Sequence, residues 1–147
     1  MTRPYQVLDE YRPSIWKCWK IGRDLTVLTK LYGLVPLKAA DSRYERAPWH
    51  NTTLHAHVRR RTLRSPDGAG WHQDGDYGHV SMNHAIVLWS NVCPTEIRNN
   101  QGQVFQPKPY EVIIINNLAW YHRRPPNAPY RRFLFRQRVE VPDANTL

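Results

Sequence analysis

The chain has 147 residues, of which 41% are hydrophobic and 12% aromatic, and its 21 Lys and Arg against 12 Asp and Glu give a formal net charge of +9. This length suits one domain, and so large a share of core-forming residues excludes a disordered protein. The basic excess favours anionic partners. Nucleic acid and an anionic cosubstrate both fit it, and a generally basic proteome would explain the charge equally well.

Two features bear on the cellular compartment. The first residues contain no apolar stretch of the kind found in secretory leaders, and the longest aliphatic run, Val112 to Ile115, is too short to cross a bilayer. We therefore expect a soluble, cytoplasmic protein with no membrane contact. Cys18 and Cys93 can form one disulfide at most and lack metal-ligand spacing, so we expect free, mostly buried thiols.

The first third of the chain has a helical pattern. Pro13 to Tyr32 carries apolar residues close to a spacing of three or four, and Gly33 follows as a residue that can end a helix. We expect residues 1–47 to form an N-terminal helical support. Residues 48–141 are expected to form a β-core, within a single domain that covers residues 1–147.

After Ala47, turn-forming residues recur roughly every 8 to 12 positions, which indicates many short strands. The alternation of Leu54, Ala56 and Val58 with polar residues is typical of a half-buried strand. A hairpin turn is expected at Asn99 to Gly102. Further strands are expected at Ala85 to Val92, Thr95 to Arg98, Glu111 to Ile115, Leu118 to Arg123 and Tyr130 to Val141. About eight strands after a helix favour two facing sheets or a barrel.

Three residues have the chemistry and spacing of a metal site. His72 and Asp74 are two residues apart, so on a strand their side chains point to the same face. His122 arrives on a later predicted strand and completes one face of a metal ion. Two imidazoles and one carboxylate suit Fe(II) and leave three positions open, whereas structural zinc sites are closed and commonly use thiolates. The sequence therefore predicts His72, Asp74 and His122 as ligands.

Other histidines are weaker candidates. His55 and His57 lie on one face of a predicted strand and form a rival pair, while His79 and His84 fall in an expected loop. We interpret these four as surface residues or as residues that lie behind the ligands.

The order of these motifs resembles the iron(II)- and 2-oxoglutarate-dependent oxygenases. Gly70 to Asp74 follows a turn, strands fill the interval to Trp120-Tyr121-His122, and the next strand opens with arginine. The resemblance covers roughly residues 48 to 141, and the stretches most similar to small bacterial or phage members are Trp71 to Asp74, Pro94 to Ile97 and Glu111 to Pro126. It implies a double-stranded β-helix, a jelly-roll barrel of the cupin kind, in which His-x-Asp and the distal His hold the iron.

In this family an Arg or Lys about ten residues after the distal His binds the far carboxylate of 2-oxoglutarate. Arg131 and Arg132 stand nine and ten residues after His122. By strand parity, Arg131 shares an apolar face that we expect to point into the barrel, and Arg132 shares a charged face that we expect to meet water. A guanidinium on an apolar face needs an anion, and a carboxylate matches its planar fork. Arg131 is therefore preferred, with Arg132 as the alternative.

The resemblance implies a dioxygenase that uses Fe(II), 2-oxoglutarate and O2 and couples oxidative decarboxylation of 2-oxoglutarate to oxidation of a substrate. Asp74 favours a hydroxylase, because halogenating members carry a small residue in place of this carboxylate. The substrate cannot be identified from the sequence, although we expect a small molecule or peptide rather than nucleic acid. Two alternatives stay open: a cupin-like metal-binding barrel without oxygenase activity, and a basic nucleic-acid-binding module.

Overall fold

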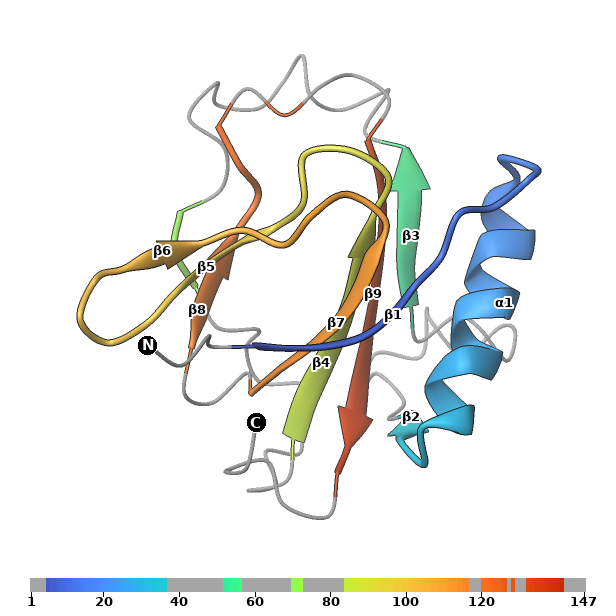
Figure 1. Ribbon diagram of the computed structural model, residues 1–147, viewed down its shortest axis with the longest axis horizontal. Helices are drawn as coiled ribbons and strands as arrows, with labels where there is room; N and C mark the ends of the chain where they lie inside the picture. Colours follow the sequence, from blue (N-terminus) through green and yellow to red (C-terminus); the bar gives the residue numbers. More distant parts are fainter. Residues whose placement is uncertain are drawn as a thin grey trace.

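The computed structural model describes residues 5–36, 52–56, 70–72, 84–116, 120–126, 128 and 132–141, with the backbone alone at Cys18, 52–56 and His84. These residues are mainly β, with one helix and two antiparallel sheets (Figure 1). The predicted class, mainly β with an N-terminal helix, is confirmed. Among the described residues, no helix combines the length and the apolar content that are needed to cross a bilayer.

The larger sheet has six strands. Its main path runs β1-β7-β4-β9-β2, and β3 also pairs with β9. The strands in this order are β1 (Tyr5–Glu10), β7 (Glu111–Asn116), β4 (His84–Ser90), β9 (Phe133–Glu140), β2 (Val35–Pro36) and β3 (Thr52–Ala56). In the centre, Ile86 of β4 lies opposite both Ile115 of β7 and Arg138 of β9. This register decides which side chains of β9 share a face with the apolar residues of β4.

The smaller sheet has the order β6-β5-β8. It consists of β5 (Glu96–Arg98), β6 (Val104–Phe105) and β8 (Tyr121–Arg123). The predicted turn at Asn99 to Gly102 joins β5 to β6. Gly102 has a φ of +82°, a backbone conformation that is unfavourable for any residue with a side chain. The Asn99 side-chain oxygen accepts the backbone N–H groups of Gln101 and Gln103 at 3.0 and 2.9 Å.

Helix α1 (Cys18–Leu31) lies within the predicted helical stretch and ends where the sequence indicated. Gly33 has a φ of +75°, its N–H donates to the Lys30 carbonyl at 2.9 Å, and the Leu34 N–H donates to the Thr29 carbonyl at 3.4 Å. This pair of bonds is the Schellman motif, which favours glycine at the left-handed position. The helix begins later than its apolar pattern, because Lys17 is still extended, with φ −112° and ψ 122°.

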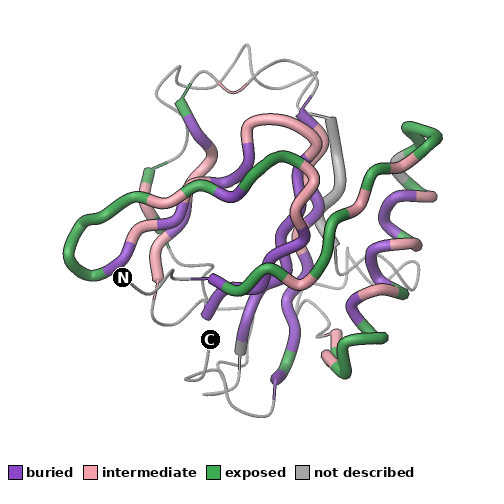
Figure 2. Tube along the Cα trace, viewed as in Figure 1, coloured by how far each residue is buried: buried purple, intermediate pink, exposed green. Residues whose placement is uncertain are grey.

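The larger sheet is covered on both faces (Figure 1). On one face α1 contributes Ile21 and Leu25 to a buried core. On the other, Ile97 of the smaller sheet joins the second core. The sheet residues of the first core include Ala85, Val87, Trp89, Val112, Ile114, Phe135 and Val139, and those of the second include Ile86, Leu88, Ile113 and Ile115. Figure 2 shows burial concentrated in the central strands and exposure on the outer side of α1 and at the β5–β6 turn.

Residues 1–47 contribute more than a helix. Strands β1 and β2, which the sequence did not predict, place this segment in the larger sheet beside the expected β-core. In β1, Tyr5 alone is buried and most of the other side chains are exposed, as expected at a sheet edge. The hydrophobic alternation that reveals a strand is therefore weak in this stretch.

Candidate metal centre

The two predicted histidine ligands lie opposite each other. The His72 N–H donates to the His122 carbonyl at 3.1 Å, and the His122 N–H donates to the His72 carbonyl at 2.9 Å. Directly opposed residues of an antiparallel pair point to the same side, and the two ring centroids are 4.6 Å apart with an interplanar angle of 61°. The structure thus brings together the local and the distal histidine of the predicted set.

These imidazoles are directed toward the space between the sheets. His122 lies opposite Ile97, whose side chain belongs to the core between the sheets, so both point the same way. His122 is buried and His72 is exposed, so the pair lies at the boundary between core and solvent. His72 Nδ1 is 2.7 Å from the Gly70 carbonyl oxygen, which only accepts hydrogen bonds. Nδ1 therefore donates, and in the neutral form of the ring Nε2 carries the lone pair that a metal requires.

The third predicted ligand, Asp74, lies outside the described residues. Arg131, His57 and His79 lie outside them too, and the side chain of His55 is not among those described. Within the part of the chain that is described, no three His, Cys, Asp or Glu residues group closely enough to hold a metal ion. The described geometry supplies two imidazoles of the predicted three-ligand set.

The register of β9 shows which face of that strand lies between the sheets. Arg136 and Arg138 lie opposite Leu88 and Ile86 of β4, two residues of the core between the sheets. Phe135 instead packs in the core beneath α1. The even-numbered face of β9 therefore points between the sheets, and Arg132, which directly precedes the strand, continues the same parity.

The expectation that this charged face meets water is wrong. Arg132 is 0% exposed and Arg138 is 6% exposed. The apolar face, in turn, packs toward α1 and not toward the smaller sheet. Alternation in the sequence separates the two faces of β9, but both faces are covered, so polarity alone does not identify the one that lies between the sheets.

Arg132 reaches the smaller sheet. Its Nη2 donates to the hydroxyl of Thr95, the residue directly before β5, at 2.7 Å. The buried Nε and Nη1 of Arg132 have no acceptor among the described residues. Burial lowers the pKa of Arg132 to about 10; Cys93 opposes this shift and Arg124 adds to it. The guanidinium is still cationic at neutral pH. Burial of a cation with two such donors is costly in free energy unless an anion accompanies it.

Cys93 lies near this guanidinium. Its thiol is free and half-buried, and its φ is +48°. Burial raises the pKa of the Cys93 thiol, while the charge of Arg132 acts in the opposite direction. Such a thiol stays protonated at neutral pH and is a poor nucleophile.

A second cluster, which the sequence did not reveal, covers the outer face of the smaller sheet. We call Trp71, Arg98, Tyr121 and Arg123 the outer ladder. The Arg98 guanidinium lies 5.1 Å from the centroid of the Trp71 ring and 5.0 Å from the centroid of the Tyr121 ring. The Arg123 guanidinium lies 4.4 Å from the centroid of the Trp71 ring. Arg123 also pairs with Glu96 at 2.8 Å. Strand alternation around His122 indicates that its neighbours point outward, but their contacts depend on the pairing of β5 with β8.

The described residues bring two imidazoles and one buried guanidinium to the region between the sheets. Two imidazoles face the interior from one side, and the buried guanidinium of Arg132 lies on the strand face turned toward that interior. No family model, curated protein or solved structure matches this chain.

Proposed function

We propose that the protein is an Fe(II)- and 2-oxoglutarate-dependent dioxygenase, in particular a hydroxylase, built on a double-stranded β-helix. The observation that carries the proposal is Arg132, a fully buried guanidinium with unused donors on the face that lies between the sheets. It stands ten residues after His122, the spacing that the family resemblance predicts for the residue that binds 2-oxoglutarate. The two facing antiparallel sheets are compatible with the proposed fold.

The residues fit the metal. His72 and His122 offer neighbouring imidazoles, the nitrogen ligands that Fe(II) accepts, and Asp74 is the proposed carboxylate ligand. Bound iron, with 2-oxoglutarate and O2, supplies the oxidation that converts a substrate C–H into C–OH and 2-oxoglutarate into succinate and CO2. Because His72 is exposed and His122 buried, a substrate can approach from the His72 side.

Arg132 is the residue we assign to the far carboxylate of 2-oxoglutarate. A carboxylate would use the two donors that lack an acceptor, in the bidentate geometry that a guanidinium favours. Thr95 would hold the guanidinium in place through its hydrogen bond to Nη2. Arg131 is kept as the second candidate on its spacing alone, nine residues after His122.

The apolar residues between the sheets have a role in this reaction. Ile86, Leu88 and Ile97 are at most 3% exposed and belong to the core between the sheets, and His122 lies opposite Ile97. Apolar walls limit the access of bulk water to a reactive centre and strengthen the electrostatic contact between an arginine and a carboxylate. The substrate must then be selected near the exposed His72 end.

The test is turnover of 2-oxoglutarate. We expect the purified protein with Fe(II), ascorbate and O2 to form succinate, and to bind 2-oxoglutarate in anaerobic calorimetry. His72→Ala, Asp74→Ala and His122→Ala should each abolish turnover, because each removes one of three protein ligands. His79→Ala, a histidine outside the set, serves as the control and should retain activity.

No succinate with amino acids, peptides, nucleobases or small metabolites as substrates, together with no binding of 2-oxoglutarate, would overturn the proposal. Retained activity in one of the three ligand variants would remove that residue from the ligand set.

A further inference from the structure

We propose that the outer ladder positions His72 as a metal ligand, with Trp71 as the central positioning residue. This inference rests on the proposed function, since it assigns a role to side chains that support the proposed iron site. It concerns residues that face away from that site and would not touch the metal or the substrate.

The attachment of His72 to the smaller sheet is short. Its pairing with β8 is an isolated bridge at His122, with one backbone hydrogen bond in each direction. Two backbone bonds fix the position of the residue along β8, and the 2.7 Å contact of Nδ1 with the Gly70 carbonyl lies within its own segment. A ligand needs closer control, because coordination depends on the direction of its lone pair.

Trp71 supplies a second attachment, on the opposite face. His122 faces inward, so its neighbour Arg123 on β8 points to the outer face, and the Trp71 ring lies against Arg123 there. There its ring is contacted by the guanidiniums of Arg98 and Arg123, with centroid distances of 5.1 and 4.4 Å. Arg98 belongs to β5 and Arg123 to β8, so the ring is attached to both neighbouring strands.

The two arginines are themselves held in place. Arg123 is paired with Glu96 at 2.8 Å, and the Arg98 guanidinium also stacks on Tyr121 at 5.0 Å. In the pairing of β5 with β8, Glu96 lies opposite Arg123 and Arg98 lies opposite Tyr121. The same pairing places His122 opposite Ile97. The outer ladder thus links the segment of one proposed ligand to the strand of the other.

The experiment measures the binding of Co2+ alone, as a stand-in for Fe(II), to the full chain by calorimetry and by its absorption spectrum. We expect Trp71→Leu and Arg98→Gln each to weaken Co2+ affinity by about 10-fold or more, the usual cost of losing a residue that orients a ligand. Trp71→Phe keeps a ring face for the guanidiniums and should restore affinity close to that of the unchanged protein. The Co2+ spectrum should change in the weakened variants, because the direction of the His72 ligand changes.

The matched control is Trp19→Leu. Trp19 also lies under a guanidinium, that of Arg23 at 5.2 Å, but on α1. This variant should bind Co2+ as tightly as the unchanged protein. Circular dichroism and thermal unfolding without metal identify any variant that fails to fold. If Trp71→Leu fails to fold, the Co2+ affinity of Arg98→Gln, compared with that of Arg98→Lys, which keeps the charge, tests the positioning role instead.

Unchanged Co2+ affinity and spectrum in folded Arg98→Gln and Trp71→Leu would overturn the positioning role while leaving the proposed function intact. Absence of Co2+ and Fe(II) binding by the unchanged protein would overturn the proposed iron site, and the positioning role with it.

Discussion

A guanidinium without access to water is stable in a fold when its donors are used or when a ligand uses them. Arg132 is fully buried, and the described chain supplies one acceptor, the Thr95 hydroxyl at 2.7 Å. Its cation has a desolvation cost that one neutral hydroxyl does not offset. Binding of a carboxylate would supply the missing charge and two further acceptors. This is the physical reason to assign the proposed binding of the 2-oxoglutarate carboxylate to Arg132.

Variants of the two neighbouring arginines test this assignment. Arg132→Met should raise the KM and the Kd for 2-oxoglutarate by about 30-fold or more, since removal of one partner of a buried charge pair costs at least about 2 kcal/mol. Arg132→Lys should have an intermediate effect, because it keeps the charge and loses the fork. Arg131→Met is the control and should change both constants much less. A larger effect at Arg131 than at Arg132 would transfer the role to Arg131.

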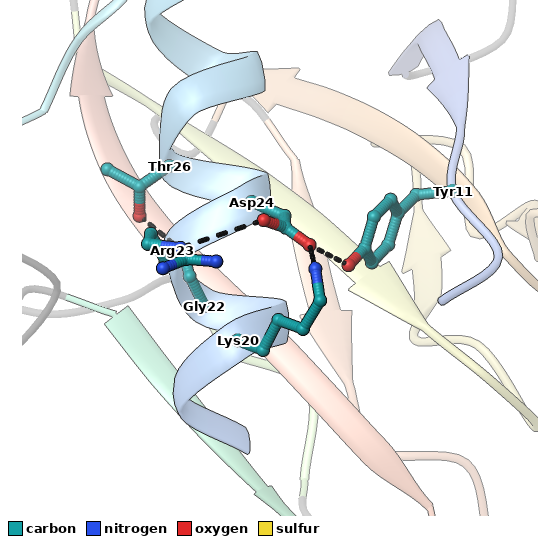
Figure 3. Close-up of polar contacts among 6 residues, drawn as sticks. All are labelled: Tyr11, Lys20, Gly22, Arg23, Asp24 and Thr26. Carbon is teal, nitrogen blue, oxygen red and sulfur yellow. Dashed lines mark hydrogen bonds and ion pairs between the residues drawn. The ribbon is translucent and has the colours of Figure 1, made fainter. Parts of the chain in front are cut away.

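At the scale of elements, α1 is tied to the end of β1 by one carboxylate. The Asp24 Oδ2 accepts the Tyr11 hydroxyl at 2.6 Å and the Lys20 ammonium at 2.8 Å (Figure 3). The Tyr11 carbonyl in turn accepts the indole N–H of Trp89 at 2.9 Å. Helix α1, the segment after β1 and strand β4 are therefore linked through Tyr11.

This link makes a pH-dependent contribution to stability. Burial alone would raise the pKa of Asp24, but the hydrogen bonds from Lys20 and Tyr11 and the charges of Lys20 and Arg23 hold it below its ordinary value of 3.8. A depressed folded-state pKa means that the stabilisation is present above the ordinary pKa and is lost as the pH falls through the folded value. Asp24→Asn should therefore lower the unfolding temperature near neutral pH.

Thermal unfolding at several pH values checks this prediction. As the pH falls from about 5 to below the folded-state pKa of Asp24, the unchanged protein should lose more stability than Asp24→Asn, and the two curves should approach each other. The other carboxylates titrate in both proteins, so the difference between the curves reports Asp24. A constant difference across this range would show that the charge of Asp24 does not stabilise the fold.

The sequence predicted those elements whose pattern is local. The helix end at Gly33 and the turn at Gly102 follow from residues that tolerate positive φ. The strands β4, β7 and β9 follow from apolar runs or alternation. Edge strands such as β1 were missed, since a strand with one buried side chain has little periodic signal.

The candidate site was predictable to a similar extent. The meeting of His72 with His122 was expected from a motif order that resembles the iron(II)- and 2-oxoglutarate-dependent oxygenases, and an isolated bridge joins the two residues. The orientation of Arg132 depends instead on which residues of β4 lie opposite β9, and the outer ladder depends on Arg98 lying opposite Tyr121. Pairing between distant strands is set by packing across the whole fold, and no local pattern encodes it.

At the scale of the whole molecule, the N-terminal segment and the β-strands form one structural unit. β1 is an edge strand of the larger sheet, and α1 buries Ile21 and Leu25 against the sheet on the side opposite the smaller sheet. A helix of 14 residues is marginal in water by itself. The helix therefore depends on the sheet for its stability, and the sheet depends on the helix to cover Val87, Phe135 and Val139.

Substitution on α1 should consequently unfold the whole molecule and not the helix alone. Leu25→Ala removes a side chain that is 0% exposed and should lower the free energy of unfolding by about 2 to 5 kcal/mol. Leu31→Ala, on the same helix but 80% exposed, is the control and should change it by about 0.5 kcal/mol or less. Denaturant unfolding should be followed by two signals, circular dichroism at a helical wavelength and tryptophan emission, to which buried Trp89 contributes. The two signals should give coincident transitions for both variants. An earlier loss of the helical signal in Leu25→Ala would show instead that residues 48–141 hold their structure without the helix.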